Sequence, residues 1–162
     1  MEYVKLGNTG MYVSRICLGC MSYGQATTGV IRWPWTLNES DGRAFIKSAL
    51  DMGITFYDTA NVYSDGESEA VLGRAIRDMA SREDMVIATK VCSPVRPGPN
   101  GRGLSRKAIM AEVDKSLARI IHECPALLCL SATFRFNAPF MTGTASADQD
   151  GHLVYGQFAR NF

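Results

Sequence analysis

The order of apolar and polar positions predicts a repeated strand–helix unit. Short runs of consecutive apolar residues, typical of strands buried on both faces, are each followed by a segment in which apolar residues recur every three or four positions. The expected strands are Ile16–Gly19, Ile54–Tyr57 and Met85–Thr89. The helices are expected after Asn38 or Ser40, at Glu67–Met79, and after Ser105. This alternation predicts an α/β fold whose parallel strands are joined by right-handed crossovers.

Residues at the segment boundaries favour the same assignment. Asn38, Ser40 and Ser105 have side chains that can cap the N-terminus of a helix. Gly53 suits the left-handed position that follows a helix. The apolar face of the first helix is expected to contain Phe45, Ile46, Ala49 and Leu50.

The two ends of the chain differ in regularity. Tyr3–Leu6 and Met11–Val13 flank a Gly-Asn turn, which predicts a β-hairpin ahead of the first strand. Ala126–Leu130 is a candidate fourth strand, and the periodic pattern stops after it. We therefore expect residues 1–130 to form the structured unit and residues 131–162 to form an irregular tail.

Composition narrows the classes of partner. The net charge is +1, which gives no electrostatic basis for binding nucleic acid or an anionic membrane. The longest apolar stretch, Pro125–Leu130, is far shorter than the ~20 residues of a membrane span. Residues 1–5 do not begin a secretory signal, and the five cysteines are an odd number, which argues against a disulfide framework. These features favour a cytoplasmic protein.

Three polar residues stand where parallel strands are expected to end. Asp58 follows one strand, Lys90 follows the next, and Tyr63 lies in the loop after Asp58. A tyrosine hydroxyl is a weak acid at neutral pH, but a neighbouring ammonium favours the phenolate, and a carboxylate can hold that ammonium in place. The three groups together could protonate a carbonyl oxygen. The alternative is that Asp58 and Lys90 are solvated loop charges.

Three stretches of the sequence resemble the aldo-keto reductase family. Residues 53–73, GITFYDTANVYSDGESEAVLG, closely resemble the family signature, and residues 6–19 and 86–90 are similar to two further family segments. The resemblance extends from residue 1 to about Arg119. It is strongest to the bacterial and fungal reductases that are similar to potassium-channel β subunits.

The resemblance implies a fold, an activity and site residues. The fold is a (β/α)8 TIM barrel closed at the bottom by the hairpin, with NADPH bound across the top. The activity is NADP-dependent reduction of an aldehyde or ketone, with the carbonyl compound as a small-molecule partner. Tyr63 is implied to be the general acid, with Asp58 and Lys90 as its supporting pair.

The sequence also departs from the family pattern. A family histidine is expected near position 131, where this chain has Ser131, and His122 is too early to replace it. A complete barrel needs roughly 200 to 250 residues, so we expect a partial barrel of a hairpin and three to four β/α units. The cofactor-binding residues of the family lie mainly in later loops, and we expect none of them here.

These departures leave three hypotheses open: a reductase, here truncated; a catalytically inactive fragment; or a non-catalytic subunit that senses the cofactor. A partial barrel is also expected to self-associate through its exposed sheet edges.

Other motifs have simpler interpretations. Cys17 and Cys20 have CxxC spacing, but we interpret them as small buried residues and expect no metal site. The charged residues between Arg102 and Arg119 are interpreted as a solvated helix surface. Trp33 and Trp35 fit a substrate pocket and ordinary rim packing equally well.

Overall fold

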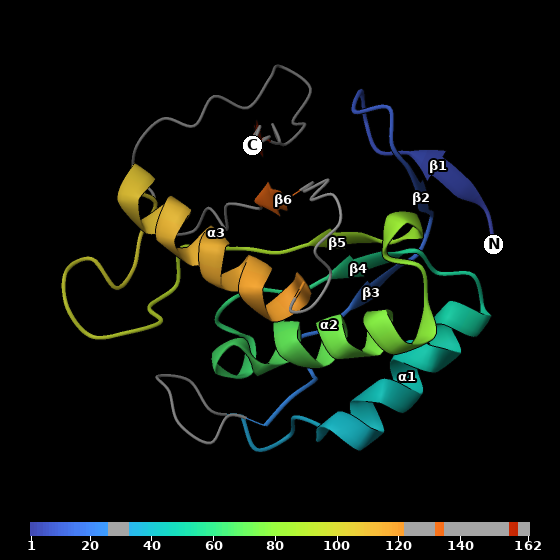
Figure 1. Ribbon diagram of the computed structural model, residues 1–162, viewed down its shortest axis with the longest axis horizontal. Helices are drawn as coiled ribbons and strands as arrows, with labels where there is room; N and C mark the ends of the chain where they lie inside the picture. The colour runs from blue at the N-terminus through green and yellow to red at the C-terminus, as the bar shows by residue number, and fades with distance from the viewer. Residues whose placement is uncertain (26–32, 122–131, 135–155, 159–162) are drawn as a thin grey trace.

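A computed structural model describes residues 1–25, 33–121, 132–134 and 156–158. It contains the predicted succession of strands and helices (Figure 1). The strands are β1 (Tyr3–Lys5), β2 (Tyr12–Ser14), β3 (Cys17–Gly19), β4 (Phe56–Asp58) and β5 (Val86–Ala88). The helices are α1 (Glu39–Asp51), α2 (Glu67–Met79) and α3 (Arg106–Ile121), with short 3₁₀ helices η1 (Tyr63–Gly66) and η2 (Arg82–Asp84).

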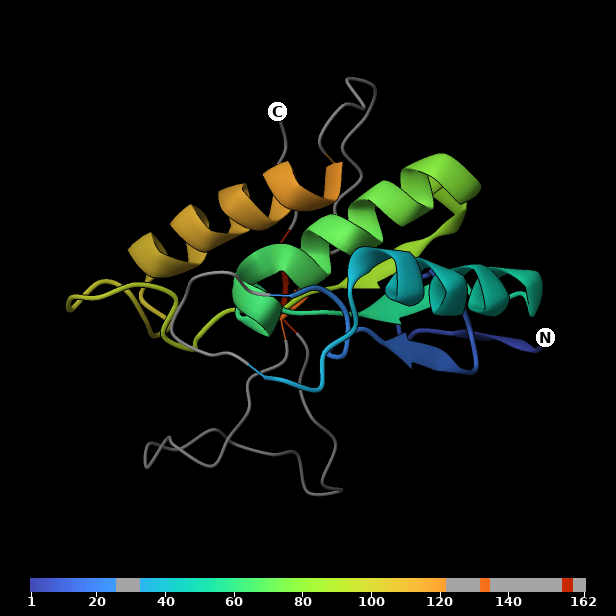
Figure 2. The same cartoon turned by 90° about the horizontal axis from the view of Figure 1, so that it is seen from below.

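Strand pairing confirms the predicted topology. β1 and β2 form an antiparallel hairpin, and β3, β4 and β5 form a parallel sheet in that order. All three helices lie on one side of this sheet (Figure 2). Two further strands, β6 (Ala132–Phe134) and β7 (Gly156–Phe158), pair antiparallel within the segment expected to be irregular. The candidate strand Ala126–Leu130 lies outside the described residues.

Helix ends follow from local side-chain chemistry. Asn38 caps α1 by accepting a 2.9 Å hydrogen bond from the backbone N–H of Asp41. Ser105 caps α3 in the same way, at 3.1 Å from the N–H of Ala108. Gly53, with φ of +79°, takes the left-handed position after α1. All three were predicted from the sequence.

The core lies between the sheet and helices α1 and α2. Its fully buried side chains include Ile46 of α1, Leu72 and Ile76 of α2, and Tyr57 of β4. Helices α2 and α3 approach each other closely at Gly73, where a Cβ atom would lie 2.7 Å from the carbonyl oxygens of Arg119 and Ile120. Only glycine permits this contact, and it brings α3 against the first half of α2.

Two burial predictions were wrong. Ile16 is 57% exposed and Cys17 is exposed, because β3 is an edge strand of the described sheet and the helices cover only its other face. Phe45 is 56% exposed, although it was assigned to the apolar face of α1. Successive helical residues differ by about 100°, so burial of Ile46 and Ala49 turns Phe45 towards solvent.

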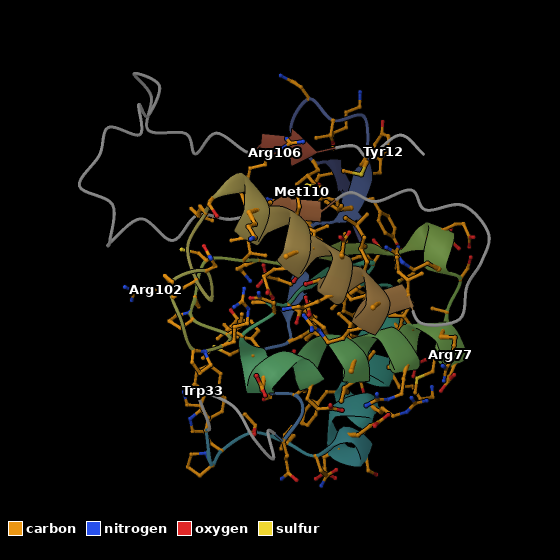
Figure 3. The ribbon with its side chains drawn as sticks, turned by 60° about the vertical axis from the view of Figure 1, so that its left-hand side comes forward. Tyr12, Trp33, Arg77, Arg102, Arg106 and Met110 are labelled. Atoms are coloured by element: carbon orange, nitrogen blue, oxygen red, sulfur yellow. The ribbon has the colours of Figure 1, made fainter. Side chains whose placement is uncertain are left out.

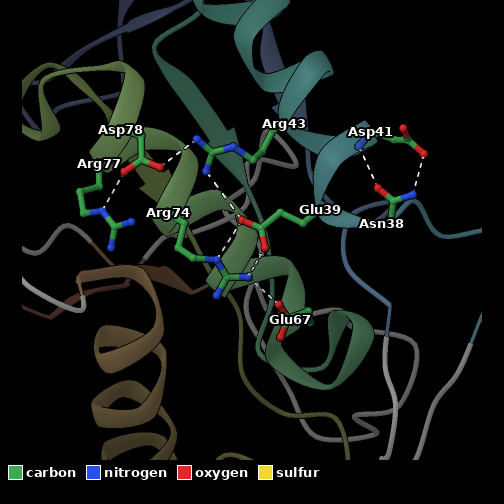
Figure 4. Close-up of polar contacts among 8 residues, drawn as sticks. All are labelled: Asn38, Glu39, Asp41, Arg43, Glu67, Arg74, Arg77 and Asp78. Atoms are coloured by element: carbon green, nitrogen blue, oxygen red, sulfur yellow. Dashed lines mark hydrogen bonds and ion pairs between the residues drawn. The ribbon is translucent and has the colours of Figure 1, made fainter.

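A chain of ion pairs fastens α1 to α2 (Figure 4). Arg74 of α2 binds Glu39 of α1 through two hydrogen bonds of 3.0 and 2.8 Å, and it also binds Glu67 at 2.7 Å. Arg43 extends the chain from Glu39 to Asp78, 2.8 Å from the Asp78 carboxylate. The bidentate arrangement at Arg74 is the geometry that makes such pairs strong.

Candidate active site

The strand register brings Asp58 and Lys90 to the same rim. Asp58 pairs with Ala88 across β4 and β5, so Lys90 lies two residues beyond that level. The backbones stay paired past the strand ends: the N–H of Thr59 donates to Ala88 O at 2.8 Å, and that of Asn61 donates to Lys90 O at 3.2 Å. These bonds fix the position of Lys90 relative to the loop that leads to Tyr63.

The Lys90 ammonium contacts three groups. It donates to the carboxylate of Asp58, to the backbone carbonyl of Thr59 at 2.8 Å, and to the Tyr63 hydroxyl at 3.5 Å. It also lies 5.1 Å from the centre of the Tyr63 ring. The side chain of Lys90 is 17% exposed and that of Asp58 is 34% exposed. The three residues predicted from the sequence therefore form one cluster that solvent can reach.

A left-handed turn holds Tyr63. Ser64 and Asp65 have φ of 49° and 58°, and Gly66 follows at 88°. Non-glycine residues adopt this conformation at a cost of roughly 1–2 kcal/mol each, and such strain persists where the surrounding contacts enforce it. Here the buried Ser64 hydroxyl donates to Gly24 O at 2.8 Å, which ties the turn to the loop after β3.

A buried carboxylate lies behind the cluster. Glu69 of α2 is fully buried and accepts hydrogen bonds from the Thr89 hydroxyl at 2.5 Å and from Arg119 Nε at 2.6 Å. Thr89 directly precedes Lys90. Glu69 was not singled out from the sequence, although its spacing from Leu72 and Ile76 places it on the buried face of α2.

A second buried pair supports the loop between Asp58 and Tyr63. Asn61 is 3% exposed, and its Nδ2 donates to Glu112 of α3 at 3.2 Å. Lys115 also binds Glu112, at 2.7 Å. Glu112 and Arg119 thus face other side chains of the protein, which corrects the interpretation of α3 as an evenly solvated charged surface.

The two tryptophans lie beside Tyr63. The rings of Trp33 and Trp35 are stacked with centres 5.4 Å apart, and the centre of Trp33 is 6.3 Å from that of Tyr63. Trp35 is 51% exposed. This aromatic wall fits both the pocket and the rim-packing interpretations.

The CxxC motif has one buried and one exposed cysteine. Cys20 is buried as predicted, whereas Cys17 is exposed. Although the residue as a whole is exposed, partial desolvation of its sulfur, reinforced by the Asp58 carboxylate, raises the pKa of the Cys17 thiol to about 11, which disfavours the reactive thiolate. Within the described ranges, no group of three or more histidine, cysteine or acidic residues is arranged to hold a metal ion.

Two positions named in the sequence analysis cannot be placed. His122 and Ser131 lie outside the described residues, and the expected domain boundary at residue 130 does too. None of the helices that the structure describes is long and apolar enough to cross a membrane.

Known proteins resemble the chain in sequence over most of its length. The profile of the aldo/keto reductase family matches residues 15–137, past the boundary expected at residue 130. Versiconal hemiacetal acetate reductase of Aspergillus parasiticus is 37% identical over 139 residues, covering 74% of this chain and 39% of that protein. A probable voltage-gated potassium channel subunit beta of Arabidopsis thaliana is 34% identical over 122 residues, covering 74% of this chain and 34% of that protein.

Solved structures agree. The holo form of aldo-keto reductase AKR11C1 from Bacillus halodurans superposes with a TM-score of 0.60 at 30% identity, covering 74% of this chain and 36% of that one. The thermostable aldo-keto reductase Tm1743, solved with the inhibitor epalrestat, gives a TM-score of 0.55 at 29% identity, over 74% of this chain and 39% of that one.

These matches confirm the predicted fold class, part of a (β/α)8 barrel. The chain spans less than two fifths of the length of these relatives. The chain belongs to the aldo/keto reductase family of oxidoreductases.

Proposed function

We propose that this chain carries the proton-donating part of an NADP-dependent reductase that converts aldehydes or ketones to alcohols. The observation that carries the proposal is the position of the Lys90 ammonium, which lies against the Asp58 carboxylate and 3.5 Å from the Tyr63 hydroxyl. A positive charge at that distance stabilises the phenolate that remains when tyrosine gives up its proton. Tyr63 is therefore the general acid for a carbonyl oxygen.

Asp58 and Thr59 keep Lys90 in place. The Asp58 carboxylate and the Thr59 carbonyl, 2.8 Å from Nζ, orient the ammonium towards Tyr63. The preceding residue, Thr89, is held by the buried Glu69. Little reorganisation is needed when the proton moves, which is the advantage of a preorganised site.

The donor set fits a nicotinamide cofactor. The family generally uses NAD(P)H, and a reduced nicotinamide supplies a hydride to a carbonyl carbon. Such a reaction needs a proton for the oxygen, and Tyr63 with Lys90 and Asp58 provides one. We assign no described residue to the phosphates of the cofactor, and the preference for NADP is part of the proposal.

The experiment measures cofactor binding and turnover separately. NADPH is titrated by fluorescence, and its oxidation is then followed with an aldehyde present, for the wild type and for Tyr63→Phe. We expect Tyr63→Phe to match the wild type in NADPH binding, and we expect it to lose about 10²- to 10⁴-fold in turnover because it lacks the proton donor. Equal turnover of the two proteins would contradict the assignment of Tyr63.

A second candidate function follows from the similarity to a potassium channel β subunit. A cofactor-sensing subunit would bind NADPH without turning over a carbonyl compound. If the wild type neither binds nor oxidises NADPH, both functions are excluded for this chain.

A further inference from the structure

The charged residues in the segment that follows β5 all have the same sign. Between residues 85 and 111 every charged residue is basic, and the next acidic residue is Glu112. The basic residues beyond Lys90 are Arg96, Arg102, Arg106 and Lys107, and we call these four the cationic rim. They come from the loop at 92–104 and from the first turn of α3.

The structure divides the charges of this region into paired and unpaired. In the C-terminal half of α3, Lys115 binds Glu112 and Arg119 binds Glu69. The four residues of the cationic rim are exposed, and none of them forms an ion pair within the described part of the chain. The charge of the cationic rim is therefore not neutralised by these neighbours.

The first turn of α3 is unusual in its charges. α1 and α2 have acidic residues in their first turns, where they interact favourably with the positive end of the helix dipole. The first turn of α3 has no acidic residue and carries Arg106 and Lys107. Its positive charges add to the helix dipole, so the potential there is positive at the expense of helix stability.

The loop that carries Arg96 and Arg102 is braced. The N–H of Gly103 donates to Cys92 O at 2.8 Å, and the N–H of Val95 donates to Gly101 O at 3.0 Å. Arg96 donates to Asn100 O at 2.8 Å. These bonds close the backbone of the loop on itself and hold the Arg96 side chain against it.

The cationic rim belongs to the same end of the molecule as the candidate active site. Val91, next to Lys90, packs against Leu104, Ile109 and Val113. The loop at 92–104 therefore starts beside Lys90 and ends close to where it started. Figures 1 and 2 both place this loop beside the end of the sheet that bears η1. Figure 3 shows Arg102 on the same side of the molecule as Trp33, with Arg106 above them and Arg77 on the far side.

The acidic residues near the candidate active site do not cancel the positive charge of the cationic rim. Asp58 is paired with Lys90, and Glu67 is paired with Arg74. Asp65 in η1 is an exposed carboxylate for which no ion pair is seen in the described part of the chain. One such charge against four leaves the rim net positive.

We propose that the cationic rim binds the carboxylate of a carbonyl substrate, so that the preferred substrates are aldehydes or ketones that also carry a carboxylate. This proposal rests on the proposed reductase function. A carboxylate held at the rim would place the other end of the molecule, the carbonyl group, towards Tyr63. The ring of Trp33, whose centre is 6.3 Å from that of Tyr63, supplies an apolar surface for the carbons next to the carbonyl group.

The first test measures the potential of the rim without any need for activity. Trp33 and Trp35 are the two tryptophans of the chain, so its tryptophan fluorescence reports on this region. Quenching by iodide is compared with quenching by neutral acrylamide, at low and at roughly 0.3 M ionic strength. The proteins are the wild type, a rim variant (Arg102→Gln, Arg106→Gln, Lys107→Gln) and a control variant (Lys5→Gln, Arg15→Gln, Lys47→Gln).

The control variant loses the same charge far from the rim. We expect iodide quenching, relative to acrylamide, to fall in the rim variant and to stay near the wild-type value in the control. We also expect salt to weaken iodide quenching in the wild type. An equal response of the two variants would overturn the proposal, because it would mean that the rim has no local positive potential.

The second test compares 4-oxobutanoate with its methyl ester as substrates. The rim variant is expected to raise KM for the carboxylate by about tenfold, with KM for the ester and kcat for both substrates unchanged. Equal KM changes for both substrates would overturn the proposal while leaving the reductase function intact.

If neither substrate is turned over, dissociation constants from tryptophan fluorescence take the place of KM. Tighter binding of the carboxylate that is lost in the rim variant supports the cationic rim even where the reductase function fails. Equal binding of carboxylate and ester by the wild type would overturn the proposal that the cationic rim binds the carboxylate.

Discussion

Lys90 is the residue at which the contacts of the candidate site converge. Its ammonium lies on Asp58, on the Thr59 carbonyl and near Tyr63, and its backbone carbonyl accepts from Asn61. The backbone bond is independent of the side chain. A substitution of the side chain therefore separates the chemical role of Lys90 from its part in the fold.

Lys90→Met is predicted to abolish most turnover while preserving the fold. The thioether has a similar length and packs in the same space, but it provides no positive charge for the Tyr63 phenolate. We expect a loss of about 10²-fold or more in kcat, with an unchanged circular dichroism spectrum. Lys47→Met, which removes an exposed lysine paired with Asp51, is the control and should keep full activity. Near-normal turnover of Lys90→Met would refute the role given to Lys90.

The sequence predicted the side chains at the strand ends but not those behind them. Asp58 and Lys90 were found because each directly follows an apolar run, which is a local signal. Glu69 and Thr89 are far apart in the sequence, and their contact depends on how α2 packs against β5. A charged residue on an otherwise apolar helical face is the signal that could have identified Glu69.

The pair of helices α1 and α2 is held by apolar packing on one side and by ion pairs on the other. The partly buried network links Glu39 of α1 to Arg74 of α2. Hydrogen bonding to Arg74 lowers the pKa of the Glu39 carboxyl below its ordinary value. Since the folded pKa is lower than the unfolded one, the carboxylate form stabilises the fold at neutral pH.

This shift predicts a pH dependence for stability. The contribution of Glu39 is complete above the unfolded value of about 4.3 and is lost as the pH falls through the lower, folded pKa. Glu39→Gln should therefore lower the free energy of unfolding at pH 7 by less than about 1 kcal/mol, and the difference should vanish in acid. Urea unfolding at a series of pH values measures it.

Glu2→Gln is the control for this experiment. It removes an exposed ion pair in which both side chains are more than 60% exposed, 63% for Glu2 and 67% for Arg15. We expect almost no effect on stability at any pH. A deficit of Glu39→Gln that persists unchanged at low pH would show that the lost stability comes from packing rather than from charge.

At the scale of elements, helices were predicted more sharply than strands. The bounds of α2 agree with the predicted Glu67–Met79, and the caps of α1 and α3 were identified. Caps are formed by residues three positions apart, so the sequence contains the whole signal. Burial of a strand depends on which elements cover it, and Ile16 could not be assigned correctly from its own neighbours.

At the scale of the whole molecule, the described parallel sheet has an unpaired side on each of its two outer strands. β3 and β5 each pair only with β4 in the described sheet. Apolar side chains near the β3 edge and the hairpin are exposed, with Ile16 at 57% and Tyr12 at 62%. The relatives are more than twice as long as the matched segment, so their barrels contain strands for which this chain has no described counterpart in the sheet. The long signature sequence was enough to predict the barrel family, because it spans a strand, the left-handed turn after Tyr63 and a helix.

We predict that residues 1–162 self-associate in solution through the open edges of this sheet. Unpaired strand edges beside exposed apolar residues favour edge-to-edge pairing, and a charge placed at the edge opposes it. Ile16→Lys is therefore expected to shift the protein towards the monomer in size-exclusion chromatography with light scattering. Phe45→Lys adds the same charge at an exposed apolar position on α1, away from the sheet edges, and should leave the distribution unchanged. A wild type that is a monodisperse monomer at all concentrations would exclude association through the edges, and equal effects of the two lysines would assign it to general apolar exposure instead.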